Sequence, residues 1–121
     1  MGKLVHDDVL DAALNEIATA TEIYLCTAEP TSRANADSIS VIPAHTMTGG
    51  DYTNANGDTN GRKVTVAAQN GLTADATGTV DHVALCDATD LLYVTTCTGQ
   101  AVTSGNTVNI GAWDVEIADP T

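Results

Sequence analysis

The chain has 121 residues, with 16 acidic and 4 basic side chains and a formal net charge of −12. Its four cations (Lys3, Arg33, Arg62, Lys63) form no stripe, which argues against binding to nucleic acid or to an anionic membrane, because both need clustered Lys or Arg. With no Phe, one Trp and three Tyr, the core must be built from Val, Ile, Leu and Ala. So thin a core would gain from contact with a neighbouring subunit.

The absence of two segment types indicates a protein that is intracellular at synthesis. No stretch approaches the roughly 18 apolar residues that span a bilayer, and the N-terminus lacks the basic-then-apolar order of a signal peptide. Cys26, Cys86 and Cys97 stand singly among apolar residues without C-x-x-C spacing. We therefore expect three reduced, buried thiols.

The first element is a helix predicted over residues 6–20, within an N-terminal helix and arm that we place at residues 1–21. Asp7 or Asp8 can cap its first turn. Apolar residues recur at helical spacing, at Leu10, Ala13, Leu14 and Ile17. Two interpretations stay open: the stripe packs on the chain's own domain, or Leu10, Leu14 and Ile17 dock on a partner subunit.

From Glu22 onward the pattern is that of strands, and we assign residues 22–121 to one β domain. Strands are predicted at 23–26, 39–42, 64–66, 77–85, 91–98 and 107–117, with turns at 87–90 and 103–106. Pro30 should mark a strand end, since it cannot donate to a ladder. Short strands at this spacing, without crossover helices, predict an antiparallel β-sandwich or a jelly-roll-like barrel.

A long polar segment, residues 48–61, is predicted to be a turn-forming loop. Oxygen-bearing side chains alternate in it at Asn54, Asn56, Asp58 and Asn60, as in loops that wrap calcium. The EF-hand pattern fails, however, because Thr65 stands where the bidentate Glu should be. An exposed turn or a loop that contacts a partner, with Tyr52 beside it, is the other interpretation.

The sequence carries no legible catalytic or metal site, so we predict a non-enzymatic protein without cofactor or metal. His6, His45 and His82 lie far apart and outside zinc-binding pairings. Asp81 and His82 are neighbours on a strand, and neighbouring strand residues point to opposite faces, which disfavours a direct contact. Carboxylates that meet only in the fold stay open as a hydrolase alternative.

Trp113 is the one large aromatic residue of the last predicted strand. Alternation places it with Val115 and Ile117 on one face, and Asp114 and Glu116 on the other. It is either a core residue or an anchor for a neighbouring subunit.

Several runs resemble a family of small virion proteins of tailed bacteriophages. They are residues 23–30 (IYLCTAEP), 78–87 (GTVDHVALCD), 91–94 (LLYV), 104–110 (SGNTVNI) and 113–117 (WDVEI). The resemblance implies a β-sandwich assembled on a particle and carries over no catalytic residue.

We therefore expect a structural protein of the virion, assembled in the host cytoplasm. The leading hypothesis is a capsid decoration (cement) protein that bridges major capsid subunits and contacts copies of itself. A tail, collar or fibre component is the alternative in the same class. A carbohydrate- or cell-surface-binding module, with residues 48–61 as the binding edge, is the alternative in another class.

Overall fold

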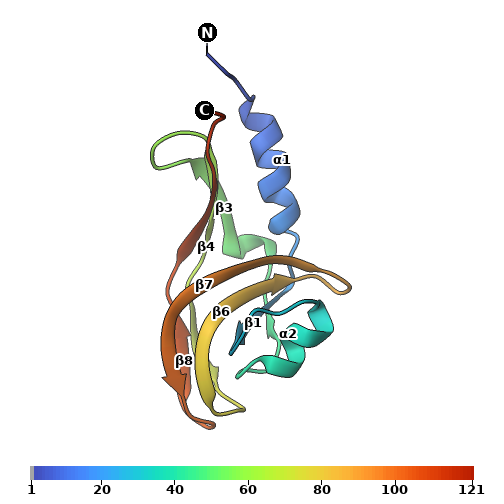
Figure 1. The fold of residues 1–121 in the computed structure, drawn as a ribbon, viewed down its shortest axis with the longest axis vertical. Helices are drawn as coiled ribbons and strands as arrows, with labels where there is room; N and C mark the ends of the chain where they lie inside the picture. Colours follow the sequence, from blue (N-terminus) through green and yellow to red (C-terminus); the bar gives the residue numbers. More distant parts are fainter. Residues whose placement is uncertain (1) are drawn as a thin grey trace.

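The computed structural model describes residues 2–121, which form a mainly β protein with a helix at the N-terminal end (Figure 1). Three antiparallel sheets have the strand orders β2-β1-β6-β7 (sheet A), β3-β4-β9 (sheet B) and β5-β8 (sheet C). They do not close into a barrel, so the sandwich form of the predicted fold class is confirmed. The elements are α1 (Asp7–Ile17), β1 (Glu22–Cys26), α2 (Arg33–Ile39), β2 (His45–Thr46), the 3₁₀ turn η1 (Gly49–Asp51), β3 (Tyr52–Asn56), β4 (Arg62–Val66), β5 (Gln69–Thr73), β6 (Gly78–Cys86), β7 (Leu91–Val102), β8 (Thr107–Ile110) and β9 (Trp113–Ile117).

Sheet A contains a long, curved hairpin of β6 and β7 (Figure 1). The register of the two strands shifts at Asp81, opposite which β7 places the three residues 97–99. Extra residues of this kind bend a strand and re-aim its side chains. The middle of β7 is therefore drawn out of regular pairing with β6.

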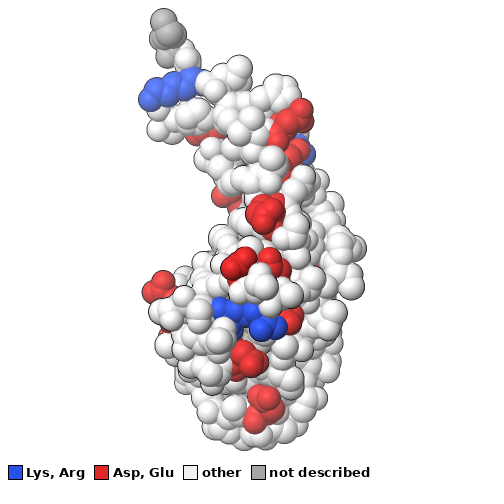
Figure 2. Space-filling view, turned by 90° about the vertical axis from the view of Figure 1, so that its right-hand side faces the viewer, with Lys and Arg blue, Asp and Glu red and all other residues white. Residues whose placement is uncertain are grey.

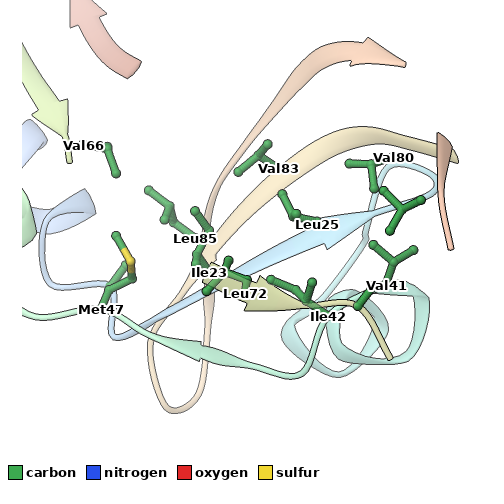
Figure 3. Close-up of a cluster of buried hydrophobic side chains, with 13 residues drawn as sticks. Ile23, Leu25, Val41, Ile42, Met47, Val66, Leu72, Val80, Val83 and Leu85 are labelled. Atoms are coloured by element: carbon green, nitrogen blue, oxygen red, sulfur yellow. The ribbon is translucent and has the colours of Figure 1, made fainter. Parts of the chain in front are cut away.

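The main core lies where the three sheets face one another. Figure 3 shows side chains of β1 and β6, such as Ile23, Leu25 and Leu85, pointing toward Met47 and Leu72. Val66 of sheet B and Val108 of sheet C belong to the same apolar cluster. One core thus joins all three sheets, built from aliphatic side chains as composition requires.

Helix α1 is capped and held by side chains other than those predicted. His6 is the N-cap, and its Nδ1 accepts from the backbone N–H of Asp8 at 3.1 Å, so neither Asp7 nor Asp8 is the cap. Asp11 accepts from Arg62 Nε at 2.8 Å, which ties the helix to β4. The helix ends at Ile17 rather than residue 20. None of the helices among residues 2–121 is long and apolar enough to span a membrane.

A second helix, α2, lies within a stretch that was expected to be a polar connection followed by a strand at 39–42. Ser32 caps it by accepting from Asn35 N at 3.1 Å, and Ala36 is buried against β1. The predicted strand is wrong, since only Ser40 makes an isolated bridge to Cys26. The apolar residues there serve the end of a helix and its connection instead.

Arg33 is the ion-pairing residue that fixes α2 over sheet A. Its Nη2 donates to both carboxylate oxygens of Glu22, at 2.7 and 2.8 Å, and its Nε donates to the carbonyl of Asp87 at 2.9 Å. The Tyr24 hydroxyl donates to the same carboxylate. The α2 side of sheet A is thereby closed by a small polar network.

Two other predicted segments differ from the structure. Residues 48–61 are not one loop, because they include η1 and strand β3, and only 57–61 form the connection to β4. The strand predicted at 107–117 is two strands, since the chain leaves β5 after Ile110 and pairs with β4 from Trp113 onward. The turn predicted at 103–106 is confirmed, with Asn106 N donating to the carbonyl of Thr103 at 3.0 Å.

Candidate functional site

The sandwich has an open side between β7 and the β8–β9 connection. Two adjoining hollows of about 200 and 390 Å³ lie there, and both are lined by Val83, Cys97, Ile110 and Gly111. β7 is the last strand of sheet A and β9 is the last strand of sheet B. Two strands with free edges therefore border one apolar hollow. We call this region the open side.

Trp113 belongs both to the core and to the open side. It is half-buried, packs against the main core cluster, and stacks on Tyr93 with ring centroids 6.1 Å apart. It also lines the larger hollow. Its Nε1 is buried without a hydrogen-bond partner among the described residues, which is uncommon for an indole N–H. The predicted alternation of β9 is confirmed, with Val115 buried and Asp114 and Glu116 exposed.

Three residues proposed as partner contacts, Tyr52, Asn54 and Asn56, alternate along β3. The Tyr52 hydroxyl donates to the carbonyl of Ala20 at 2.9 Å, and burial raises the pKa of Tyr52 to about 12. Asn54 Nδ2 donates to Asn15 of α1 at 2.9 Å, while Asn56 Oδ1 accepts from Arg62 at 2.7 Å. The alternation that suggested a calcium loop is the period of a strand with these side chains bound inside the chain.

Asp58, the fourth of these residues, sits in the tight β3–β4 connection. It accepts from Lys63 Nζ at 2.7 Å, and its backbone N–H donates to Glu116 Oε1 at 2.8 Å. A Cβ on Gly57 would lie 2.0 Å from the carbonyl oxygen of Asn60, so only glycine fits there. Gly61 has φ +72, a left-handed conformation that also favours glycine. This connection is shaped by its own hydrogen bonds.

The predicted docking stripe of α1 faces the chain's own sheet B. Leu10 and Leu14 are buried, and Leu14 packs with Val64 and Val115. Ile17 packs against both this cluster and the main core. Of the two interpretations left open by the sequence, the structure shows the first, and these three side chains form no exposed docking face. Ala13, placed on the same stripe, is exposed.

Asp81 and His82 do touch, against the prediction. Asp81 Oδ1 lies 2.7 Å from His82 Nδ1. The register shift at Asp81 is the physical reason, because it breaks the regular up-and-down alternation on which the prediction relied. The imidazole lies beside a shallow, open hollow with Glu29, Thr95 and Thr96. No hydrogen bond within residues 2–121 joins its Nε2 to a nucleophile, so the pair orients an imidazole without completing a catalytic arrangement.

The three cysteines have two different environments. Cys26 and Cys86 are buried, and burial raises the pKa of each thiol to about 11. Cys97 is exposed on β7, so the prediction that it is buried is wrong. Partial burial together with nearby Asp81 raises its pKa as well. All three thiols are free, and Cys97 is the one on the open side.

The open side could not be found by reading the sequence, because it arises from strands that are distant along the chain. The one local signal was the run Thr95–Gln100, whose small and polar residues fit poorly in the middle of a fully paired strand. Figure 2 adds that acidic side chains are spread along the length of the face it shows. Among residues 2–121, no three His, Cys, Asp or Glu side chains cluster as metal ligands would.

Comparisons with known proteins returned no match. No protein-family model fits the chain, and no curated protein or solved structure is significantly similar to it. The arguments for function therefore come from the fold and the open side described above.

Proposed function

We propose that this protein is a non-enzymatic structural subunit that functions by contact with other proteins in a larger assembly. The observation that supports this best is the open side. An apolar hollow bordered by two free strand edges is the kind of surface to which an extended segment of another chain adds by main-chain hydrogen bonds and side-chain insertion. Interface cores also favour half-buried aromatic residues such as Trp113.

The specific form that we propose is a capsid decoration protein of a tailed bacteriophage, which bridges major capsid subunits on the head. It rests on the resemblance of residues 23–30 and of the C-terminal runs to virion proteins. A stable contact would bury about 800 Å² on each partner, and repetition over a shell would add avidity. The net charge of −12 favours a basic partner surface.

Two alternatives remain from the sequence. A tail, collar or fibre subunit would use the same kind of contact. A carbohydrate-binding module was motivated by residues 48–61, but Tyr52, Asn54, Asn56 and Asp58 are engaged with α1, β4 and the α1–β1 connection. No observation favours that module over a structural subunit.

Immunogold labelling and gel densitometry of particles purified from the source culture test the proposal. A head decoration protein should label heads and be present in hundreds of copies per particle. Labelling confined to tails, with a few dozen copies, would assign the chain to the tail. Absence of the chain from every particle fraction would overturn the proposal.

A further inference from the structure

We infer that the N-terminal arm of one copy, residues Gly2–Val5, occupies the open side of a second copy. The inference goes beyond the proposed function, because it concerns the isolated protein and holds whether or not a particle is present. It rests on the arm, on the open side and on the charge of the chain.

The arm has apolar surface without a cover. Leu4 is 90% exposed, the highest value among the exposed large hydrophobic side chains of residues 2–121. Residues 2–5 belong to no helix or strand, and no backbone hydrogen bond to the body is found for them in the described part of the chain. Figure 1 shows this segment projecting past the end of α1. An exposed leucine on an extended segment is suited to insertion into an apolar hollow.

The arm also carries the one cation that is not used inside the chain. Within residues 2–121, Arg33 pairs with Glu22, Arg62 with Asp11, and Lys63 with Asp58 and Asp114. Lys3 instead donates to the backbone oxygen of Thr121. A second copy presents 16 carboxylates against 4 cations, so its surface attracts Lys3.

The open side has what an extended segment requires. Its floor is apolar, formed by core residues such as Leu25, Val80 and Val83. The free edges of β7 and β9 can pair with backbone N–H and C=O groups. The buried Nε1 of Trp113 lacks an acceptor, and a carbonyl of the arm would supply one.

The chain's own arm is badly placed to fill its own open side. The ion pair of Asp11 with Arg62 and the burial of Leu14 hold α1 against sheet B. In Figure 1 the N-terminus lies at one end of the long axis, whereas β7 and β8 meet toward the other end. The arm must therefore come from another copy, by reciprocal exchange in a dimer or by sequential exchange in a ring.

Light scattering behind size exclusion, over an about hundredfold range of protein concentration, tests the inference on the full chain. The wild type should form a dimer or a larger closed assembly. Leu4→Ser, and deletion of residues 2–5, should weaken association by at least about tenfold, since both remove a buried leucine. Val9→Ser is the matched control: Val9 is 60% exposed but lies on α1 outside the arm, so its variant should associate as the wild type does.

The thiol of Cys97 provides a readout specific to the open side. Maleimide labelling of Cys97 should slow as the wild-type concentration rises and should stay fast at all concentrations in the arm-deleted variant. Circular dichroism confirms that each variant folds.

Four outcomes would overturn the inference: a wild type that stays monomeric throughout the range, an assembly that persists unchanged in Leu4→Ser and in the deletion, a Val9→Ser variant that dissociates as readily as Leu4→Ser, or labelling of Cys97 that does not depend on concentration. None of them bears on whether the chain is found in particles, which immunogold labelling decides separately.

Discussion

At the scale of single residues, Trp113 has the most to lose on substitution. Its ring packs against the aliphatic core and against Tyr93, while its edge lines the open side. The indole N–H is buried without an acceptor, so the residue contributes through its apolar area rather than through a hydrogen bond. Removal of the ring and removal of the N–H should therefore have different effects.

Trp113→Ala should lower the free energy of unfolding by about 3 kcal/mol, because a large aromatic ring leaves a cavity. Trp113→Phe keeps a ring and removes an unsatisfied donor, so it should cost less than about 1.5 kcal/mol. Urea denaturation followed by circular dichroism measures both, since the variants lack the tryptophan. Equal costs for the two variants would show that the indole N–H has a partner.

Glu22 makes the stability depend on pH. Burial acts to raise its pKa, but the hydrogen bonds from Tyr24 and Arg33 and the charge of Arg33 outweigh this and lower the pKa below its ordinary value of 4.5. The unfolded chain then binds more protons than the folded one in this range. The contribution of Glu22 is therefore present above pH 4.5 and is lost as the pH falls through the lowered pKa.

Glu22→Gln should reduce the steepness with which unfolding free energy falls between about pH 5 and pH 3. Asp51, Asp87 and Asp114 also have lowered pKa values, so some acid destabilisation should remain. Urea titrations at several pH values measure the slope. Glu29→Gln, at an exposed position, controls for the change in net charge, and an unchanged slope in Glu22→Gln would contradict the assignment.

At the scale of elements, α1 is part of the fold and not an appendage to it. Its buried face is joined to sheet B by Leu14, Val64 and Val115, and its polar contacts reach β3 through Asn15 and β4 through Asp11. The opposite face exposes Val9 and the acidic side chains of the first turn. The helix therefore offers a matched pair of positions, one buried and one exposed.

Leu14→Ala should destabilise the chain by about 3 kcal/mol, and Val9→Ala should change stability by no more than about 0.5 kcal/mol. Thermal or urea unfolding measures both. Deletion of residues 1–20 should be worse than either, because it uncovers Val64 and Val115 together. A truncated chain that keeps the full strand signal and the wild-type midpoint would show that α1 is dispensable for folding.

The elements that sequence predicted correctly are those whose pattern is local. The apolar stripe of α1 and the alternation of β9 come from side-chain period alone, and both are present. The helix α2 was missed because Ala36 is its one fully buried residue, too little for a periodic signal. The pairing of β8 and β9 with different sheets was missed because Ile110 and Trp113 read as one continuous strand.

The candidate site was predictable only in part, for a related reason. Trp113 was identified because large aromatic residues are rare in this chain and suit interfaces. Its neighbours on the open side, Cys97 and Ile110, come from strands that meet only in three dimensions. The contact between Asp81 and His82 depends on a register shift that no local pattern announces.

At the scale of the whole molecule, one core holds three small sheets together. Sheet C has two strands, and an isolated two-stranded sheet is at best marginally stable in water. Leu72 of β5, Val66 of β4 and Leu85 of β6 share the main apolar cluster (Figure 3). Each sheet therefore depends on the others for the burial of its apolar face, although the open side leaves that core uncovered at one place.

This dependence predicts a single cooperative unfolding transition for residues 2–121. Trp113 fluorescence reports on sheet B, and the reactivity of the buried thiols of Cys26 and Cys86 reports on sheet A. Both signals should change at the same urea concentration as the circular dichroism, because loss of either sheet exposes the shared core. Low protein concentration and the arm-deleted variant keep association from shifting the midpoint. Thiol exposure that precedes the change in Trp113 fluorescence would show that sheet A unfolds by itself, and that the sheets are not held by one core.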